Sequence, residues 1–161
     1  LEFRRVLFRS PGWLDPALEV LARHREIGAV GWSGGWFSAG RGRGAVVDTL
    51  PDRGAGKLRD GFRTDVAYLA TSGLVVPRSV LARTAGFDER LDPTCFEDTD
   101  LSFQIKEAGF ELAYCPGLGV DHRPHATTSA LAAYDEVYRR NERLFLEKWR
   151  HRPEYFFDVP D

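Results

Sequence analysis

A helix that runs into a strand can be recognised directly in residues 98–115, and this unit constrains the fold more than any other stretch of the chain. Carboxylates stand at the start of the helix, where they favour the positive end of the helix dipole. Leu101 and Ile105 lie on one face, and Gly109 ends the helix. Residues 110–115 then read as an apolar strand. A helix followed at once by a strand predicts an α/β fold in which polar residues gather at the ends of the elements.

Similar patterns occur on both sides of this unit. Asp15-Pro16 predicts the start of a helix, because proline is favoured at the first helical position. Ser79 can cap a short helix, and Gly86 is placed to end it in a left-handed conformation. The remaining predicted elements are a helix over 15–24, strands over 27–32 and 66–76, a short helix over 79–84, and a long amphipathic helix over 129–149.

The segment 33–61 is rich in glycine and predicts a mobile loop. Loops of this length inside a domain are often lids or binding loops, and a disordered connector fits the composition equally well. The glycines do not match a phosphate-binding motif. Residues 40–44 lack the third glycine of G-x-G-x-x-G, and Gly56-Lys57 is not followed by serine or threonine. These two motifs therefore do not predict nucleotide binding.

The composition argues against several classes of protein. With 161 residues, 43% of them hydrophobic, the chain can bury one ordinary core. Lys plus Arg total 22 against 24 for Asp plus Glu, so the overall charge gives no reason to expect a nucleic-acid partner. Cys95 and Cys115 are too few for a disulfide framework, which favours a reduced, cytoplasmic protein. The longest apolar stretch, 66–76, is shorter than the roughly 20 residues that a membrane-spanning helix needs.

The first ten residues, LEFRRVLFRS, differ in character from the rest. They lack the clean apolar segment and the small-residue cleavage site of a signal peptide. They resemble translated adapter sequence. We therefore expect residues 1–10 to be a non-native leader and residues 11–161 to carry the fold.

Glu97, Asp98 and Asp100 place three carboxylates at the mouth of one predicted helix. Acids at a helix N-terminus stabilise the helix by roughly 0.3–1 kcal/mol each, so a purely structural role explains the cluster about as well as a functional one. The wider sequence around the cluster favours function.

That wider sequence resembles the family 2 glycosyltransferases. Residues 86–90 (GFDER), residues 96–103 (FEDTDLSF), then Ala108-Gly109-Phe110 and a strand ending at His122 follow the order and spacing of that family. The resemblance is nearest to the rhamnosyltransferase-like and O-antigen-type members, and it covers essentially all of the chain after residue 10. It implies a partial GT-A fold, in which this chain forms the C-terminal, acceptor-side half with a mixed sheet and flanking helices.

The resemblance also implies roles for individual residues. Asp98 matches the general base that takes a proton from an acceptor hydroxyl, and an ordinary aspartate is ionised at neutral pH. His122 matches a ligand of a divalent metal, Mn²⁺ or Mg²⁺, which neutralises the leaving diphosphate. The residues expected to contact donor or acceptor are Glu97, Asp100, Ser72, Gly73 and Trp36, and fixing the loop is the alternative role of Glu97 and Asp100.

Several of these roles have a structural alternative. His122 at a strand end is also explained by a bond to a carboxylate such as Asp121, and His125 is better explained without a metal. The break at Thr71-Ser72-Gly73 is equally well explained as a strand irregularity. Trp32 and Trp36 suit an anchor for the glycine-rich segment better than a platform for a sugar ring.

Complete members of the family carry an upstream nucleotide-binding half that ends in a D-x-D metal motif. The D-x-D in this chain, Asp98-Thr99-Asp100, begins a helix and precedes His122 by about two dozen residues, which fits the downstream base motif instead. We therefore expect this chain to be a fragment of the parent enzyme and to be inactive by itself.

The resemblance predicts an inverting glycosyltransferase that moves a sugar from a nucleotide-sugar donor to a glycan or lipid-linked hydroxyl acceptor, in cell-surface polysaccharide or glycolipid synthesis. It implies a cytoplasmic protein that meets the inner membrane peripherally through its acceptor. Two other functions stay open from the sequence. One is a non-catalytic carbohydrate-binding or interaction module that uses the same half-fold. The other, ranked last because such sites need more ligands, is a metal-dependent hydrolase that uses Asp98, Asp100, His122 and His125.

Overall fold

The computed structural model of the chain describes residues 6–8, 11–37, 46–48, 58, 60–122 and 133–158. Its elements, in chain order, are β1 (Val6–Phe8), α1 (Asp15–Arg23), β2 (Ile27–Gly31), β3 (Gly34–Phe37), β4 (Val46–Asp48), β5 (Tyr68–Leu69), α2 (Arg78–Leu81), η3 (Glu89–Leu91), α3 (Glu97–Glu107), β6 (Glu111–Tyr114), η4 (Pro116–Leu118), β7 (Val120–His122), α4 (Tyr134–Trp149) and η6 (Pro153–Tyr155).

The strands form small parallel and antiparallel sheets. β2 and β6 pair in parallel, with Ala29 opposite Leu112 and Gly31 opposite Tyr114. β3 lies between β4 and β5 and is antiparallel to both. β1 pairs with β7 in the antiparallel sense, so that Val6 faces His122. This mixed pairing with flanking helices confirms the predicted α/β class.

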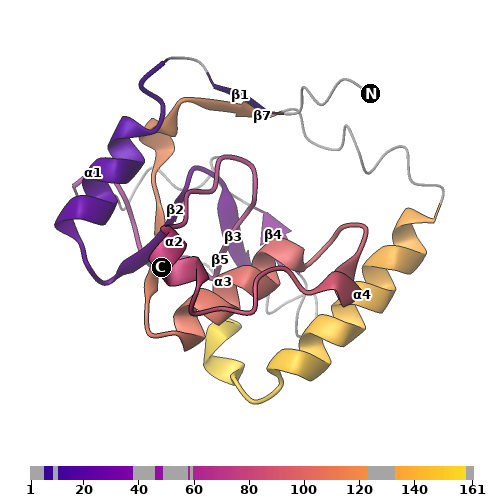
Figure 1. The fold of residues 1–161 in the computed structure, drawn as a ribbon. Coiled ribbons are helices and arrows are strands. Elements are labelled where there is room, and N and C mark those ends of the chain that lie inside the picture. Colours follow the sequence, from indigo (N-terminus) through magenta and orange to yellow (C-terminus); the bar gives the residue numbers. More distant parts are fainter. Residues whose placement is uncertain are drawn as a thin grey trace.

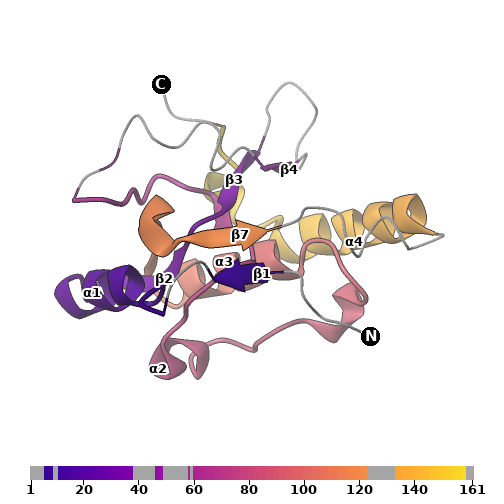
Figure 2. The ribbon, with the colours of Figure 1, turned by 90° about the horizontal axis from the view of Figure 1, so that it is seen from above.

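The helices enclose the strands from different directions. α1 and α4 lie at opposite sides of the molecule, with β2, β3, β5 and α3 between them (Figure 1). Figure 2, a view from above, shows the same separation and looks onto the β1–β7 pair. Sites formed by α3 are therefore supported by α4 on one side and by the strands on the other.

The buried hydrophobic residues of the described stretches form two cores. α1 covers a smaller one that includes Val30, Ala113 and Val120. The larger core lies between α3, α4 and strands β3, β5 and β6, and it is rich in aromatic rings. Phe103 and Phe145 are both fully buried there, with ring centroids 5.1 Å apart. Burying a phenylalanine contributes about 1.5–3 kcal/mol, so the contact between α3 and α4 is a main source of stability.

The structure confirms the elements whose start and stop signals are local. The helix predicted over 15–24 is α1, the strand over 27–32 is β2, and the helix and strand over 98–115 are α3 and β6. Gly109 has a φ of 87°, which only glycine adopts without strain, and the chain leaves α3 there as predicted. The described part of the last helix, α4, begins at Tyr134, and residues 129–132 lie outside the described residues.

Three expectations were wrong in part. The segment 33–61 contains strands β3 and β4, because their pairing partners are distant in sequence and no local alternation marks them. The strand predicted over 66–76 shrinks to β5, since the chain turns at Thr71-Ser72-Gly73. Helix α2 begins at Arg78 after Pro77, so Ser79 does not cap it. The mobility expected for 33–61 concerns residues that are largely outside the described ones.

Candidate active site at the start of helix α3

Asp98 lies in the first turn of α3 and is only partly exposed. One of its oxygens, Oδ1, accepts hydrogen bonds from the backbone N–H of Thr99 at 2.8 Å and from the Thr99 hydroxyl at 3.3 Å. The backbone N–H of Thr71 also donates to this carboxylate. Burial nevertheless raises the pKa of Asp98, because desolvation of the charged form outweighs these bonds. A carboxylate with a raised pKa is a stronger proton acceptor.

Glu97 precedes Asp98 and has an unusual environment. Burial, followed by the neighbouring charge of Asp98, raises the pKa of Glu97 from 4.5 to about 7. Its Oε2 atom is buried and has no hydrogen-bond partner among the described residues. Two adjacent carboxyl groups with raised pKa values are typical of functional sites, although ion-pair networks shift pKa values as well.

The turn Thr71-Ser72-Gly73 lies directly against this pair. Thr71 contacts Asp98 through its backbone, as described above. Gly73 has a φ of 73°, and a Cβ added there would stand 2.7 Å from Cδ1 of Trp32 and 2.7 Å from Cγ2 of Val120. Glycine is therefore required both by the backbone conformation and by the close approach of two neighbours. The Thr71–Gly73 turn and the start of α3, which the sequence predicts to form one site, therefore lie side by side.

Strand β7 also approaches this turn. Val120, which touches the position of Gly73, is the first residue of β7, and His122 follows two residues later. A strand rises by about 3.3 Å per residue, so the backbone of His122 lies within about 7 Å of that of Val120. The side chain of His122 is outside the described part of the structure, as is all of His125. A metal-binding role for His122 thus stays a prediction.

The described side chains do not by themselves form a metal site. Among them, no group of three or more His, Cys, Asp or Glu residues is placed to hold a metal ion. Hard divalent cations prefer several oxygen ligands. Glu97 and Asp98 supply carboxylates, but a complete ligand set would need groups from outside the described residues.

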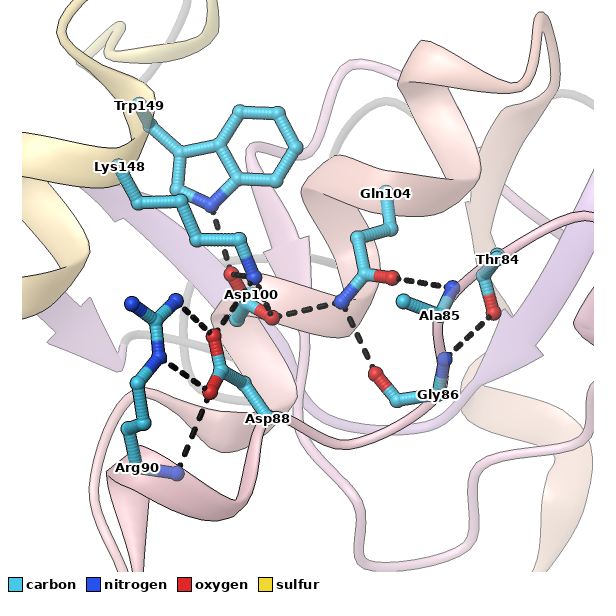
Figure 3. Close-up of polar contacts among 9 residues, drawn as sticks. All are labelled: Thr84, Ala85, Gly86, Asp88, Arg90, Asp100, Gln104, Lys148 and Trp149. Carbon is cyan, nitrogen blue, oxygen red and sulfur yellow. Dashed lines mark hydrogen bonds and ion pairs between the residues drawn. The ribbon is translucent and has the colours of Figure 1, made fainter.

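Asp100, two residues further along the same first turn of α3, accepts hydrogen bonds on both oxygens and is completely buried. Oδ1 accepts from the indole N–H of Trp149 at 2.7 Å, and Oδ2 accepts from Lys148 at 2.9 Å and from Gln104 at 2.6 Å. Lys148 also contacts Asp88 at 3.0 Å (Figure 3). Asp100 therefore ties the start of α3 to the end of α4.

The same network continues into the segment before α3. Arg90 and Lys148 hold the pKa of Asp88 far below its usual range. Gln104 donates to the carbonyl of Gly86 at 2.9 Å and accepts from the N–H of Ala85 at 2.8 Å, as Figure 3 shows. Residues 85–90 are thus fixed to both helices, and the first turn of α3 has a rigid support.

A comparison with protein families identifies the chain. The model for "Glycosyltransferase like family 2" matches residues 53–143, which is more than half of the chain. The chain belongs to this family. The match includes the Thr71–Gly73 turn, the Glu97–Asp98 pair and His122.

Individual relatives of this chain agree with the family. Two curated proteins, from Mycobacterium tuberculosis strains CDC 1551 / Oshkosh and ATCC 25618 / H37Rv, are each 33% identical over 82 residues. Both are named N-acetylglucosaminyl-diphospho-decaprenol L-rhamnosyltransferase. The matched region is 50% of this chain and 26% of the relative, so the similarity concerns one part of a longer protein. No solved structure gives a significant match.

The structure corrects two of the residues predicted to bind substrate in this member of the family. Asp100 is occupied on both oxygens and has no exposed surface, so it cannot contact a sugar. Trp36 is also fully buried, its indole N–H donates to the carbonyl of Asp65 at 2.6 Å, and Arg63 covers its ring. It is an anchor for β3. Ser72 and Gly73 lie at the site, and their predicted contacts with substrate stay predictions.

Sequence reasoning missed the supports of the site. Lys148 and Trp149 hold Asp100 from almost 50 residues away. One available signal was the spacing of Phe145 and Trp149, which places both on the helix face that packs on α3. The sequence did not indicate that Asp100 is the carboxylate of the acidic cluster that is buried.

We expect Glu97 to make the stability of this chain fall as pH rises from about 4.5 to about 7. The folded state keeps a proton on Glu97 over this interval, whereas the unfolded state releases it. This contribution is fully present below pH 4.5 and is lost as pH passes about 7. It amounts to roughly 1–3 kcal/mol. Urea unfolding from pH 4 to 8 should show that Glu97→Gln has a flatter profile than the wild type.

The exposed Glu89 provides a control for this experiment. Glu89→Gln removes the same charge outside the pair, so its profile should run parallel to that of the wild type. If Glu97→Gln declined as steeply as the wild type over the same interval, the raised pKa of Glu97 would be wrong.

Proposed function

We propose that this chain is the acceptor-side part of an inverting glycosyltransferase with Asp98 as its general base. The observation that carries the proposal is the placement of Asp98, which combines a raised pKa with a direct contact to the Thr71–Gly73 turn in a chain of this family. A general base must be a good proton acceptor within reach of the acceptor hydroxyl. A partly exposed, desolvated carboxylate at a helix start meets both needs.

The proposed reaction is a single displacement. The acceptor oxygen attacks the anomeric carbon of the donor sugar as the bond from that carbon to the diphosphate oxygen breaks. The hydroxyl proton moves to a carboxylate oxygen of Asp98, and the nucleoside diphosphate leaves with the bonding electrons. Attack from the face opposite the leaving group inverts the anomeric centre. Positioned general bases of this kind contribute typically two to four powers of ten in rate.

Other residues of the chain would position the substrates. Glu97 has a buried oxygen that no described residue bonds, so it is suited to bond a sugar or acceptor hydroxyl. The glycine at position 73 leaves room for close approach to the backbone of the turn. Family 2 enzymes generally use a divalent metal, which as a Lewis acid neutralises the charge of the leaving diphosphate. His122 is the proposed ligand from this chain.

The partners of the reaction follow from the family and the relatives. We propose a nucleotide-sugar donor and a glycan or lipid-linked acceptor, since the mycobacterial relatives are named for a diphospho-decaprenol substrate. Within the described stretches, no helix combines the length and the apolar character needed to cross a membrane. Work at the cytoplasmic face of a membrane, reached through the acceptor, would suit such a substrate and is part of the proposal.

The alternative, a non-catalytic carbohydrate-binding or interaction module, has less support. Its ligand surface would use Trp32, Trp36 and the acidic cluster. Trp36 and Asp100 are buried, which removes two of those contacts. A binding module also has no need for a desolvated carboxylate whose pKa is raised.

The test is a transfer assay with an enzyme in which a nucleotide-binding half accompanies this chain. Incubation with nucleotide sugars, Mn²⁺ and a polyprenyl-diphospho-sugar acceptor should give a product whose anomeric configuration, read by NMR coupling, is opposite to that of the donor. The chain by itself should give no turnover. A product with retained configuration, or binding of sugars without transfer by the complete enzyme, would contradict the proposal.

A further inference from the structure

The segment that leads into α3 has a conformation that needs support. Cys95 and Phe96 both have positive φ values, of 76° and 71°. Left-handed backbone costs roughly 1 kcal/mol or more for a residue other than glycine, and it persists only where the surroundings fix it. The two residues directly precede Glu97 and Asp98. Any relaxation of this segment would therefore move the carboxyl pair.

Asn141, on α4, holds this segment through hydrogen bonds to its backbone. It is completely buried, and its Nδ2 atom donates to the carbonyl of Leu91 at 2.6 Å and of Thr94 at 2.7 Å. The carbonyl of Cys95 lies 3.2 Å away as a third acceptor. An amide has only two N–H donors, so the third contact shares one of them. One side chain thus fixes three backbone groups.

Arg140 completes this arrangement. Its Nε donates to Oδ1 of Asn141 at 2.9 Å, which orients the amide so that the NH₂ group faces the carbonyls. Its terminal nitrogen also donates to the carbonyl of Asp92. Arg140 and Asn141 together bond to four carbonyls within residues 91–95. Arg140 itself is exposed.

The rest of the same face of α4 continues the support. The ring of Phe96 packs on Phe145 at 5.2 Å and on Tyr138 at 5.1 Å between centroids. One turn beyond Phe145, Trp149 bonds to Asp100. The chain is thus fastened to α4 both before and after Glu97 and Asp98, and the pair lies between the two attachments.

We propose that Arg140 and Asn141 are positioning residues of the proposed glycosyltransferase site. They hold residues 91–96 so that the carboxyl groups of Glu97 and Asp98 stay close together and shielded from water. The inference rests on the proposed function of Asp98. The two residues touch neither donor nor acceptor. They act through the backbone that precedes Glu97 and Asp98. In their absence the two carboxyl groups would become hydrated.

The test uses the chain as it is and reads the site without transfer. The backbone amides of Thr71 and Thr99 both bond to the Asp98 carboxylate, so their NMR shifts report its protonation. In Asn141→Ser we expect the midpoint of both titrations to fall by about one pH unit or more, because Asp98 becomes hydrated. Arg140→Ala should lower the midpoint by a smaller amount. Because Arg140 is exposed, the change removes little packing and the variant should fold.

A matched control separates positioning from general stability. Ile27 is buried in the core beneath α1 and makes none of the hydrogen bonds described for residues 91–98, so Ile27→Ala destabilises the fold by removing packing alone. Its midpoint should equal that of the wild type. An unchanged midpoint in Asn141→Ser, or in Arg140→Ala if the first variant does not fold, would overturn the inference. Because the titration requires no transfer, this failure is distinguishable from failure of the proposed function.

Discussion

Asp100→Asn is expected to lower the free energy of unfolding of this chain by about 3 kcal/mol. Asp100 is fully buried and accepts hydrogen bonds from three side chains that join α3 to α4. An asparagine there removes one of the two carboxylates that compensate Lys148, whose side chain is only 28% exposed, and leaves Asp88 as the other. It also turns an NH₂ group toward groups that are themselves donors. Removing one partner of a buried ion pair is costly because the other partner stays buried.

Urea unfolding at neutral pH measures this loss. Asp135→Asn is the matched control, since Asp135 is exposed in the first turn of α4. That change should cost less than about 1 kcal/mol, the usual contribution of an acid to a helix N-terminus. Equal unfolding midpoints for the two variants would show that the network around Asp100 does not hold the helices together.

The parts of the fold that were predictable carry their signals within a few residues. α1 has Pro16 in its first turn, and α3 ends where Gly109 adopts a positive φ. β2 and β6 are short runs of apolar residues, as buried parallel strands usually are. Such signals act locally, so a single sequence is enough to find them.

The parts that were missed depend on partners distant in sequence. β3 is a strand because it pairs with β4 and β5, and its residues Gly34 and Gly35 have no preference for a strand. Gly34 is required there, since a Cβ would stand 2.2 Å from the carbonyl oxygen of Tyr68. Composition alone made this stretch read as a loop.

In the candidate site, too, the local signals were predictable and the contacts between distant residues were not. The motif order located Glu97, Asp98 and the Thr71–Gly73 turn, which the structure brings together. It assigned the base to Asp98, but it did not separate the roles of Glu97 and Asp100, because both are acids in the first turn of one helix. Lys148 and Trp149, far along the chain, make Asp100 a structural residue. The backbone support by Asn141 likewise became visible only from the structure.

Asp98→Asn has the largest effect expected on activity. In an enzyme that contains this chain together with a nucleotide-binding half, kcat should fall by about two to four powers of ten, because asparagine cannot accept the proton of the acceptor hydroxyl. KM for the acceptor should change little, since an asparagine has nearly the same shape and still bonds to the N–H of Thr71 and Thr99. Loss of kcat without loss of binding indicates an interaction made only in the transition state.

The stability of this variant supplies an internal check. Burial makes the charged form of Asp98 costly, so replacement by a neutral amide should leave the free energy of unfolding unchanged or increase it at pH 8. Asp98→Asn and Asp100→Asn should therefore have opposite profiles. The first loses activity and keeps stability, whereas the second loses stability.

Single-turnover kinetics of Asp98→Asn, with the exposed Asp135→Asn variant as control, test most directly whether Asp98 is the base. With saturating donor and acceptor, the rate of sugar transfer should fall at least about a hundredfold in Asp98→Asn and stay at the wild-type value in the control. A transfer rate in Asp98→Asn within about threefold of the wild type, a difference below roughly 1 kcal/mol, would contradict the assignment of Asp98 as the base.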